Sequence, residues 1–515
     1  MRRLLVVAVS IVALGGCVAL FDFGAYDTSR PEAAALDATE DAAAFEPFGI
    51  SLGSAAQSGV SGEPVTLEVT VQRRGVADVI VLGLAGASDV ALAAAPIPLG
   101  TDKVSVTITP GTRHGLASLS LTATAASYPG FTASAPFTLD VRGKPGTLDT
   151  SFANDGVFAP AFDLSARDVA VLPDNRIVVA GGSGSQDGVL DVIRLLPEGV
   201  LDPTFGTGGR TRAVEPTTGG EGATGVALRP DGTALVVGNR VVPGGVDVVV
   251  VAALDGRGVK DPTFGDAGVV VLDSLGSAGS ASIALVPGSG FVATNGNFIA
   301  GRLSRGEPAL AFGDAGTVYR DNERFSGAAL DLTGGAVIGG VSTAKLTGPL
   351  IALSLDANGS VRGYFKEELE QFCMSARPIR LASGPVVLVA TCSVDVGAAP
   401  SPALVAVAVD AGVVPSFGAA GIARENEAVS RITGVAVDGG LATVKLHDLD
   451  TAGAPNPRLV LTTFNENGVL RWTTAKTMFP ALTGMTQFAA ATDHANRVVI
   501  VGTKGPRPIV ARFWL

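Results

Sequence analysis

The sequence contains few of the residues that metal sites and acid–base catalysts use. Its 515 residues include three cysteines and three histidines, whereas a zinc site needs several Cys or His ligands and His is the commonest general base. Aromatic residues make up 5% of the chain, which weakens a role in stacking against sugars. We therefore expect no metal ion, no cofactor and no catalytic residue.

Positive charge is also scarce. The 37 Lys and Arg residues are outnumbered by 48 Asp and Glu residues, so the formal net charge is -11, the wrong sign for binding nucleic acid phosphates. Charged residues reach 17% against 47% hydrophobic ones, and 67 residues are Gly. This composition excludes a chain that is disordered throughout, and a Gly share well below one-third excludes collagen. The sequence predicts a folded protein that does not bind nucleic acid.

No apolar run is long enough to be a permanent membrane-spanning helix. The run Leu4–Leu14 follows two arginines and precedes Gly15-Gly16-Cys17, which is the order of basic, apolar and small residues in a secretory signal. This segment resembles the bacterial lipobox. The resemblance implies that residues 1–16 are a lipoprotein signal peptide and that Cys17 carries the lipid, with palmitate among its acyl chains. An ordinary signal peptide that happens to contain Cys is the alternative.

An acidic stretch follows the lipidation site. The residue after Cys17 is Val18 rather than Asp, which by the same resemblance favours the outer membrane of a bacterial envelope. From Val18 to Pro47 the chain has seven acidic residues and one Arg among many Ala. Such a stretch buries too little apolar surface to offset its ordering entropy. We expect residues 17–47 to be the lipidated Cys and a flexible tether.

Residues 48–142 alternate apolar and polar side chains with a period of two, as in Val65–Val71, which is typical of strands with one buried face. About seven candidate strands, with Pro129-Gly130 as the turn before the last, predict an Ig-like β-sandwich. The segment has no Cys and no Trp, and it resembles the disulfide-free Ig-like modules of bacterial surface proteins. We expect a rigid spacer whose one histidine, His114, is solvated in a loop.

Residues 144–515 repeat a short motif. It occurs at residues 148–152, 201–206 and 260–265, with degraded copies at 311–316 and 415–421. A turn followed by an apolar strand, and a strand that ends in a polar turn, each occur about seven times. Seven units over this stretch give a period of about 53 residues, close to the roughly 40–50 residues of WD40 and kelch blades.

Each repeated unit has about four short strands and no helical pattern, which is the content of a propeller blade. A sheet with two apolar faces must bury both, and a ring of such sheets does so without exposed ends. The predicted fold class is therefore all-β, an Ig-like β-sandwich followed by a seven-bladed β-propeller. Either the units are sequential, or the strand within residues 147–158 completes the last blade.

The motif Leu-Asp-x-Thr/Ser-Phe-Gly-x-x-Gly, with a Pro-Asp-Gly turn and an Ile-Val-Val-Ala-Gly strand at this period, resembles the delta-60 repeat family. The resemblance covers residues 144–515 and implies a propeller-like protein of a bacterial surface, with no general activity. Ala309, Arg362, Val414 and Arg471 stand where the motif has Asp. A catalytic carboxylate repeated in every unit is therefore not expected.

We interpret the motif residues as structural. Asp149, Asp202 and Asp261 can accept backbone N–H bonds within their turns. Phe side chains are large enough to pack as apolar wedges between blades. The expected wedges are Phe152, Phe205, Phe264, Phe312 and Phe417.

Cys373 and Cys392 remain once Cys17 is lipidated. They are 19 residues apart (392 minus 373), on strands that flank the turn at Ser383-Gly384. Pairing about that turn places the two cysteines almost opposite each other. In an oxidising compartment this arrangement predicts a cross-strand disulfide.

The leading functional hypothesis is a monomeric, lipid-anchored envelope protein. Its lipid on Cys17 would contact the membrane, and its propeller would be a binding or scaffolding platform for a protein or glycan partner. One alternative is a propeller enzyme, such as a hydrolase, lyase or quinoprotein dehydrogenase, with its site in the central channel. Another is a structural component of the envelope.

An enzyme would need reactive groups at the centre of the propeller. The candidate carboxylates are Asp247, Asp331 and Asp410, which could bind a cation or act as acid and base. His447 and His494 are the other imidazoles, and we expect them to be exposed loop residues. Clustered carboxylates in the channel would favour the enzyme, whereas a channel lined by Gly, Ala and Val would favour the platform.

Overall fold

The computed structural model describes residues 48–515 with internal gaps. The gaps are residues 184–188, 216–221, 243–245, 273–280, 287, 289, 331–334, 344–347, 368–371, 383–384, 394–400, 409–411, 420, 425–430, 450–454, 474–481 and 483. The predicted signal peptide, Cys17 and tether lie outside the described residues. No helix in the part of the chain that the structure describes is long and apolar enough to cross a membrane.

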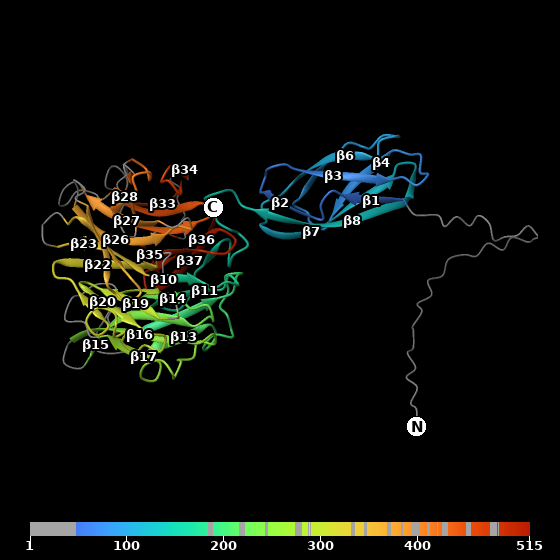
Figure 1. Ribbon diagram of the computed structural model, residues 1–515. Coiled ribbons are helices and arrows are strands. Elements are labelled where there is room, and N and C mark those ends of the chain that lie inside the picture. Colours follow the sequence, from blue (N-terminus) through green and yellow to red (C-terminus); the bar gives the residue numbers. More distant parts are fainter. Residues whose placement is uncertain are drawn as a thin grey trace, which may run out of the picture.

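The regular structure is all-β, as predicted. Across the described residues there are 37 strands, β1 to β37, and no α-helix. Figure 1 shows two bodies: an N-terminal unit (residues 48–142, blue) beside a larger body built from residues 144–515 (green to red), with the C-terminus close to their junction.

The N-terminal unit consists of two four-stranded sheets. Their strands are β1 (Gly49–Leu52), β2 (Ala56–Val60), β3 (Val65–Gln72), β4 (Ile80–Ala85), β5 (Ala91–Ala93), β6 (Lys103–Thr109), β7 (Gly115–Ala125) and β8 (Tyr128–Arg142). One sheet has the order β1-β3-β6-β5 and the other β2-β8-β7-β4. Leu67 and Val69 of β3 are buried while Glu68 is exposed, and Leu67 shares one apolar core with Leu139 of β8. The two sheets therefore pack face to face.

The predicted turn at Pro129-Gly130 is wrong. Both residues lie inside β8, and the hairpin between β7 and β8 turns at Ala126-Ser127. The Asp78 carboxylate accepts the backbone N–H of Ser127 at 2.6 Å, so a side chain distant in the sequence stabilises a turn that lacks both Gly and Pro.

Residues 157–514 form seven further sheets among the described residues, numbered 1 to 7 here. Sheet 1 has β10 (Ser165–Val171), β11 (Ile177–Gly182), β12 (Leu190–Leu195) and β13 (Arg210–Val214). Sheet 2 has β14 (Gly222–Leu228), β15 (Ala234–Val242), β16 (Val246–Leu254) and β17 (Val269–Leu272). Sheet 3 has β18 (Ser282–Leu285), β19 (Phe291–Asn295), β20 (Phe298–Arg302) and β21 (Thr317–Tyr319), and sheet 4 has β22 (Glu323–Leu330), β23 (Ala336–Ser342), β24 (Leu350–Leu355) and β25 (Val361–Glu367).

The remaining sheets follow in chain order except for one strand. Sheet 5 has β26 (Phe372–Arg380), β27 (Val386–Ser393), β28 (Ser401–Ala408), β29 (Gly412–Val413) and β30 (Ile422–Arg424); sheet 6 has β31 (Arg431–Val437), β32 (Gly440–Leu449), β33 (Pro455–Asn465) and β34 (Leu470–Thr473); sheet 7 has β35 (Met485–Thr492), β36 (Arg497–Lys504), β37 (Arg507–Trp514) and β9 (Val157–Phe158). Strand β9 pairs antiparallel with β37. The N-terminal strand of the repeat region therefore completes the last sheet, which is one of the two arrangements that the sequence left open.

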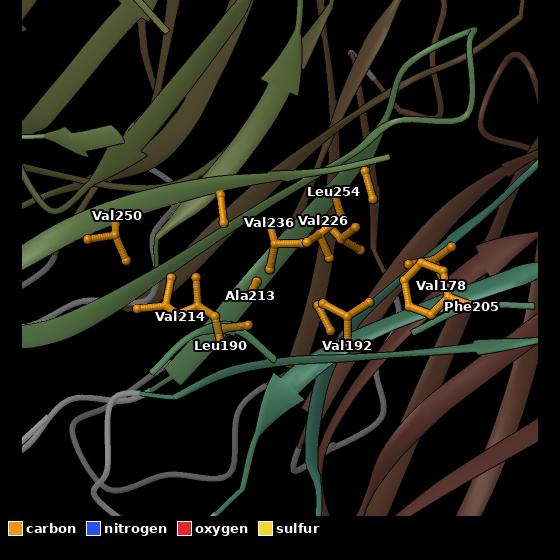
Figure 2. Packing of buried hydrophobic residues seen from close by; sticks show 14 of the residues in the cluster. Val178, Leu190, Val192, Phe205, Ala213, Val214, Val226, Val236, Val250 and Leu254 are labelled. Atoms are coloured by element: carbon orange, nitrogen blue, oxygen red, sulfur yellow. The ribbon is translucent and has the colours of Figure 1, made fainter. Parts of the chain in front are cut away.

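The seven sheets contact one another in a closed order. The first strand of each sheet contacts the first strand of the next, and β35 of sheet 7 contacts β10 of sheet 1. Seven buried apolar clusters each join two successive sheets. Figure 2 shows the cluster between sheets 1 and 2, where Leu190 and Val192 of sheet 1 lie on one side and Val236 and Val250 of sheet 2 lie on the other. Both faces of these sheets are therefore buried against neighbours.

The predicted disulfide is confirmed. Cys373 of β26 lies directly opposite Cys392 of β27 in the strand register, and the two sulfurs are bonded. Both residues are buried in the cluster between sheets 4 and 5.

Candidate functional site

The motif phenylalanines lie where one sheet meets the next. Each is almost completely buried, and its ring packs against a Gly in the turn that follows the third strand of the next sheet. The five pairs are Phe152–Gly199, Phe205–Gly258, Phe264–Gly306, Phe312–Gly359 and Phe417–Gly468. At Gly199, for example, φ is +82° and an added Cβ would lie 2.7 Å from the Phe152 ring. We call each such contact a joint and name it by its two sheets, from joint 7/1 to joint 5/6.

The motif aspartates bond to their own turns. Oδ1 of Asp202 accepts the backbone N–H of Thr204 at 2.9 Å and its hydroxyl at 2.6 Å. Asp149 makes the same pair of bonds with Ser151, and Asp261 with Thr263. These are the bonds of an Asx turn, in which the carboxylate fixes the backbone that leads to the Phe.

Two of these aspartates have buried arginine partners, which the sequence analysis did not identify. Nε of Arg194 donates to Oδ2 of Asp202 at 2.7 Å, and Nε of Arg512 donates to Oδ2 of Asp149 at 2.8 Å. The two arginine side chains are 2% and 3% exposed. Each guanidinium lies over the motif Phe ring, with its carbon 4.6 Å from the ring centroid, a cation–π geometry.

The same guanidinium groups reach the next sheet. Nη1 of Arg194 donates to the carbonyl of Gly256 and Nη1 of Arg512 to that of Pro197, both at 2.6 Å. Burial alone would raise the pKa of Asp202, but the Thr204 bonds and the charge of Arg194 hold that pKa below its usual value. Joints 7/1 and 1/2 therefore contain the same buried charged unit of Asp, Arg, Phe and a carbonyl.

Joint 2/3 obtains its guanidinium from another strand connection. Ala253 occupies the position of Arg194, because its N–H bonds to the carbonyl of Gly268 as that of Arg194 bonds to Gly209. Arg229, in the turn between β14 and β15, instead donates to the carbonyl of Ser304 in sheet 3. Its guanidinium carbon lies 5.7 Å from the Phe264 ring centroid.

His114 connects the N-terminal unit to sheet 7. Its Nδ1 accepts the indole N–H of Trp514 at 3.1 Å and the backbone N–H of Thr150 at 3.2 Å, and it lies 3.8 Å from Oδ1 of Asp149. The side chain is 7% exposed, so the expectation of a solvated loop His is wrong. A Cβ at Gly143 would collide with the Trp514 ring, so the linker is packed tightly here. Burial lowers the pKa of His114, and the Asp149 charge opposes this in part.

The carboxylate of Asp168 lies on β10, the first strand of sheet 1, and the first strands are those through which the seven sheets contact one another in a closed order. Asp168 follows a bulge in β10, and its Oδ2 accepts the backbone N–H of Val226 in sheet 2 at 2.8 Å. Burial raises the pKa of Asp168, and the positive charge of Arg377 in sheet 5 opposes this in part. A carboxyl group of raised pKa that faces a guanidinium is a combination found at functional sites as well as in structural networks. The equivalent positions in sheets 2 and 4 are Gly225 and Gly327.

The other candidates from the sequence are placed as follows. Asp331, Asp410 and the side chains of Asp247 and His447 lie outside the described residues. His494 is in an exposed turn, and its backbone N–H donates to Asn175 at 2.8 Å. Within the described ranges, no group of three His, Cys, Asp or Glu side chains is arranged to hold a metal ion.

No family model matches the chain, and no curated protein matches it either. Among solved structures it is similar to a quinonprotein alcohol dehydrogenase-like protein from Bacteroides thetaiotaomicron, at 10% identity over 81% of this chain and 93% of that chain, with a TM-score of 0.35. It is also similar to an endo-arabinase from the same organism (9% identity, 65% and 98% covered, TM-score 0.29) and to the polysaccharide lyase Uly1 (10%, 77% and 85%, 0.28). TM-scores this low carry no argument about this chain.

Proposed function

We propose that sheets 1 to 7 are the blades of a seven-bladed β-propeller and that the N-terminal unit is an Ig-like sandwich. The closed order of contacts among the first strands supports the propeller. The pairing of β9 with β37 supports a ring whose ends are joined. Within this proposal the motif remains similar to that of the delta-60 repeats. The part that its copies in this chain share is the Phe–Gly contact of each of the five joints.

The proposed function is that of a lipid-anchored platform in a bacterial envelope, which displays the propeller to a protein or glycan partner. The observation that carries it is the His114 connection. His114, Trp514 and Thr150 bond the N-terminal unit directly to sheet 7, so the spacer and the propeller would move as one body. A rigid spacer of this kind would hold the propeller at a fixed distance from the tether.

The lipid anchor is tested with one pair of variants. Cys17→Ser should abolish labelling of the full chain by a palmitate analogue. Cys392→Ser, which removes the disulfide but not the lipidation site, should leave the labelling unchanged. Labelling of Cys17→Ser at the wild-type level would contradict the lipid anchor.

A central enzyme site is the second candidate, and Asp168 favours it. Its raised pKa and the facing charge of Arg377 are features of acid–base sites as well as of structural networks. Asp168→Asn keeps an oxygen acceptor for the Val226 N–H. If the variant loses turnover of a glycan substrate while its unfolding midpoint stays unchanged, the protein is an enzyme with a central site and not a binding platform.

A further inference from the structure

Joint 3/4 contains a cavity at the motif loop. Its volume is about 270 Å³, and its lining includes Val286, Gly301, Ala309, Phe312, Asp356 and Ala357. This size is close to the lower limit of small-molecule pockets, roughly 300 Å³. The lining joins residues of sheet 3 to the turn after β24 in sheet 4.

The backbone shows which residues this cavity replaces. The N–H of Gly301 bonds to the carbonyl of Gly316, and the N–H of Ala309 bonds to the carbonyl of Gly301. Arg194 and Asp202 make the same two bonds in sheet 1. Gly301 therefore occupies the Arg position of joint 1/2, and Ala309 occupies the Asp position.

The alternative source of a guanidinium is missing as well. Val286 N–H bonds to the carbonyl four residues later, at Gly290, as Arg229 N–H bonds to that of Thr233. Val286 thus stands where joint 2/3 has the arginine that reaches sheet 3. Joint 3/4 has no arginine at either position, and both positions line the cavity.

The groups that contact a guanidinium in the other joints are still present. Phe312, the equivalent of Phe205, lines the cavity, and its ring lies close to the backbone of Gly301. The turns after β16 and β24 are equivalent, because the N–H of Asp255 bonds to the carbonyl of Val259 and the N–H of Asp356 bonds to that of Ser360. Ala357 follows Asp356 as Gly256 follows Asp255. The Ala357 carbonyl is therefore equivalent to the one that accepts Arg194.

We propose that this cavity binds a guanidinium group brought by a ligand, either an alkylguanidine or an arginine side chain of a peptide. The planar cation stacks on Phe312, donates to the Ala357 carbonyl and lies near the Asp356 carboxylate. Oδ1 of Asp356 already accepts the N–H groups of Asn358 and Ser360 at 2.8 Å, which orients the carboxylate.

Arg302 in the lining places a positive charge that opposes every cation, and a small, multiply charged metal ion most of all. Nη1 of Arg302 donates to the carbonyls of Gly301 and Gly316 at 2.9 and 2.8 Å. A small, strongly hydrated ion would face this charge without gaining from the ring. A guanidinium is weakly hydrated and gains from the ring face.

Calorimetric titration of the full chain with ethylguanidinium chloride tests the proposal. We expect a dissociation constant near ~1 mM, the range for a ligand of about six non-hydrogen atoms. Ethylammonium chloride is the matched control and should bind at least ~10-fold more weakly, because it cannot donate in a planar fork. Equal binding of the two cations, or no binding of ethylguanidinium up to ~10 mM, would overturn the proposal.

Val286→Arg places a covalent guanidinium in the cavity by the route that Arg229 uses. It should weaken ethylguanidinium binding at least ~10-fold and raise the thermal midpoint, whereas Val259→Arg, at an exposed position outside the cavity lining, should bind like the wild type. Restoring Arg at Gly301 is a poorer test, because its Cβ would collide with Phe312. Unchanged affinity in Val286→Arg would overturn the assignment.

Asp356→Asn gives a second test that does not depend on how Val286→Arg folds. The Asn side chain keeps the oxygen that caps its turn and loses the charge, so affinity should fall by ~3- to 10-fold, more at low salt than at high salt. An unchanged affinity would contradict the proposed ion pair. Titration with N-acetyl-Gly-Arg-Gly-amide then separates the sources: tighter binding than ethylguanidinium assigns the site to an arginine of a peptide, and weaker binding assigns it to a small alkylguanidine.

Discussion

Joints 1/2 and 3/4 use the same backbone for different side chains. Joint 1/2 has a buried Asp202–Arg194 pair over Phe205, whereas joint 3/4 has Ala309, Gly301 and a cavity over Phe312. Both keep the Phe ring against a Gly of the next sheet. The comparison shows that the apolar contact is the shared part of a joint, and that the buried charges are an addition that one joint can omit.

The largest expected effect comes from removing the shared part. Phe205→Ala should lower the free energy of unfolding by about 4 kcal/mol, because it leaves a cavity beneath a buried guanidinium. The urea unfolding midpoint measures this. Val200→Ala, at an exposed position in the same connection, is the control and should stay within about 0.5 kcal/mol of the wild type. If the two variants lose the same stability, the Phe is not the central contact.

The next effect comes from removing one charge of joint 1/2. Arg194→Ala removes the closest partner of the buried Asp202 carboxylate and leaves only Arg176, 3.6 Å away and 31% exposed, so it should cost about 3 kcal/mol. The double variant Arg194→Ala/Asp202→Asn removes that charge and keeps an oxygen for the Thr204 bonds, so it should be more stable than the single variant. Equal or lower stability of the double variant in the same urea assay would show that the charge of Asp202 is not the cause.

The same pair gives a pH dependence. The folded-state pKa of Asp202 lies below the ordinary Asp value of 3.8, so its stabilisation is complete above the unfolded pKa and is lost as the pH falls through the folded one. Between about pH 5 and pH 3 the wild type should lose more stability than Arg194→Ala/Asp202→Asn. Parallel pH curves for the two proteins would be inconsistent with this.

The smallest effect concerns the connection between the two bodies. The pKa of buried His114 is lowered from 6.5, so as the pH falls His114 takes up a proton more readily in the undocked protein than in the docked one. Docking of the N-terminal unit on sheet 7 is therefore favoured above pH 6.5 and weakened below it. Small-angle scattering at pH 7.5 and at about pH 5 should show a broader distribution of dimensions at the lower pH. His114→Gln can still accept the Trp514 N–H and should show no pH dependence. The same broadening in His114→Gln would exclude His114 as the titrating group.

Local sequence patterns were sufficient to predict the strands, the hydrogen bonds that the motif aspartates accept within their turns, and the disulfide. Period-two alternation identified the strands, and symmetry about one turn identified Cys373 and Cys392 as opposite each other. These features depend on residues close together in the chain, for which geometry follows from spacing.

The arginine partners could not be predicted in this way. Arg512 and Asp149 are 363 residues apart, and the two meet only because β9 lies in the last sheet. Arg194 is in β12, which also contains the charged residue Asp191, so the pattern gave no reason to single out the arginine. An arginine that recurs at the end of a repeated third strand, as Arg194 and Arg512 do, is the signal that could have revealed both.

The central Asp168 was missed for a different reason. It follows a bulge in β10, and a bulge shifts the alternation by one residue. Simple period-two reading therefore assigns the following side chains to the wrong face. The carboxylates named from the sequence were chosen without that correction.

The pairing of β9 with β37 also constrains how the chain reaches its folded state. Sheet 7 cannot be completed until the final strand has been synthesised, because its outermost partner was made more than 340 residues earlier, as Val157 and Ala511 show. Until then β9 remains unpaired while the intervening sheets form. Because it has only two residues, it exposes little hydrogen-bonding edge to other chains. Closure is then a single late event of high contact order, and its rate should limit the appearance of the protease-resistant protein.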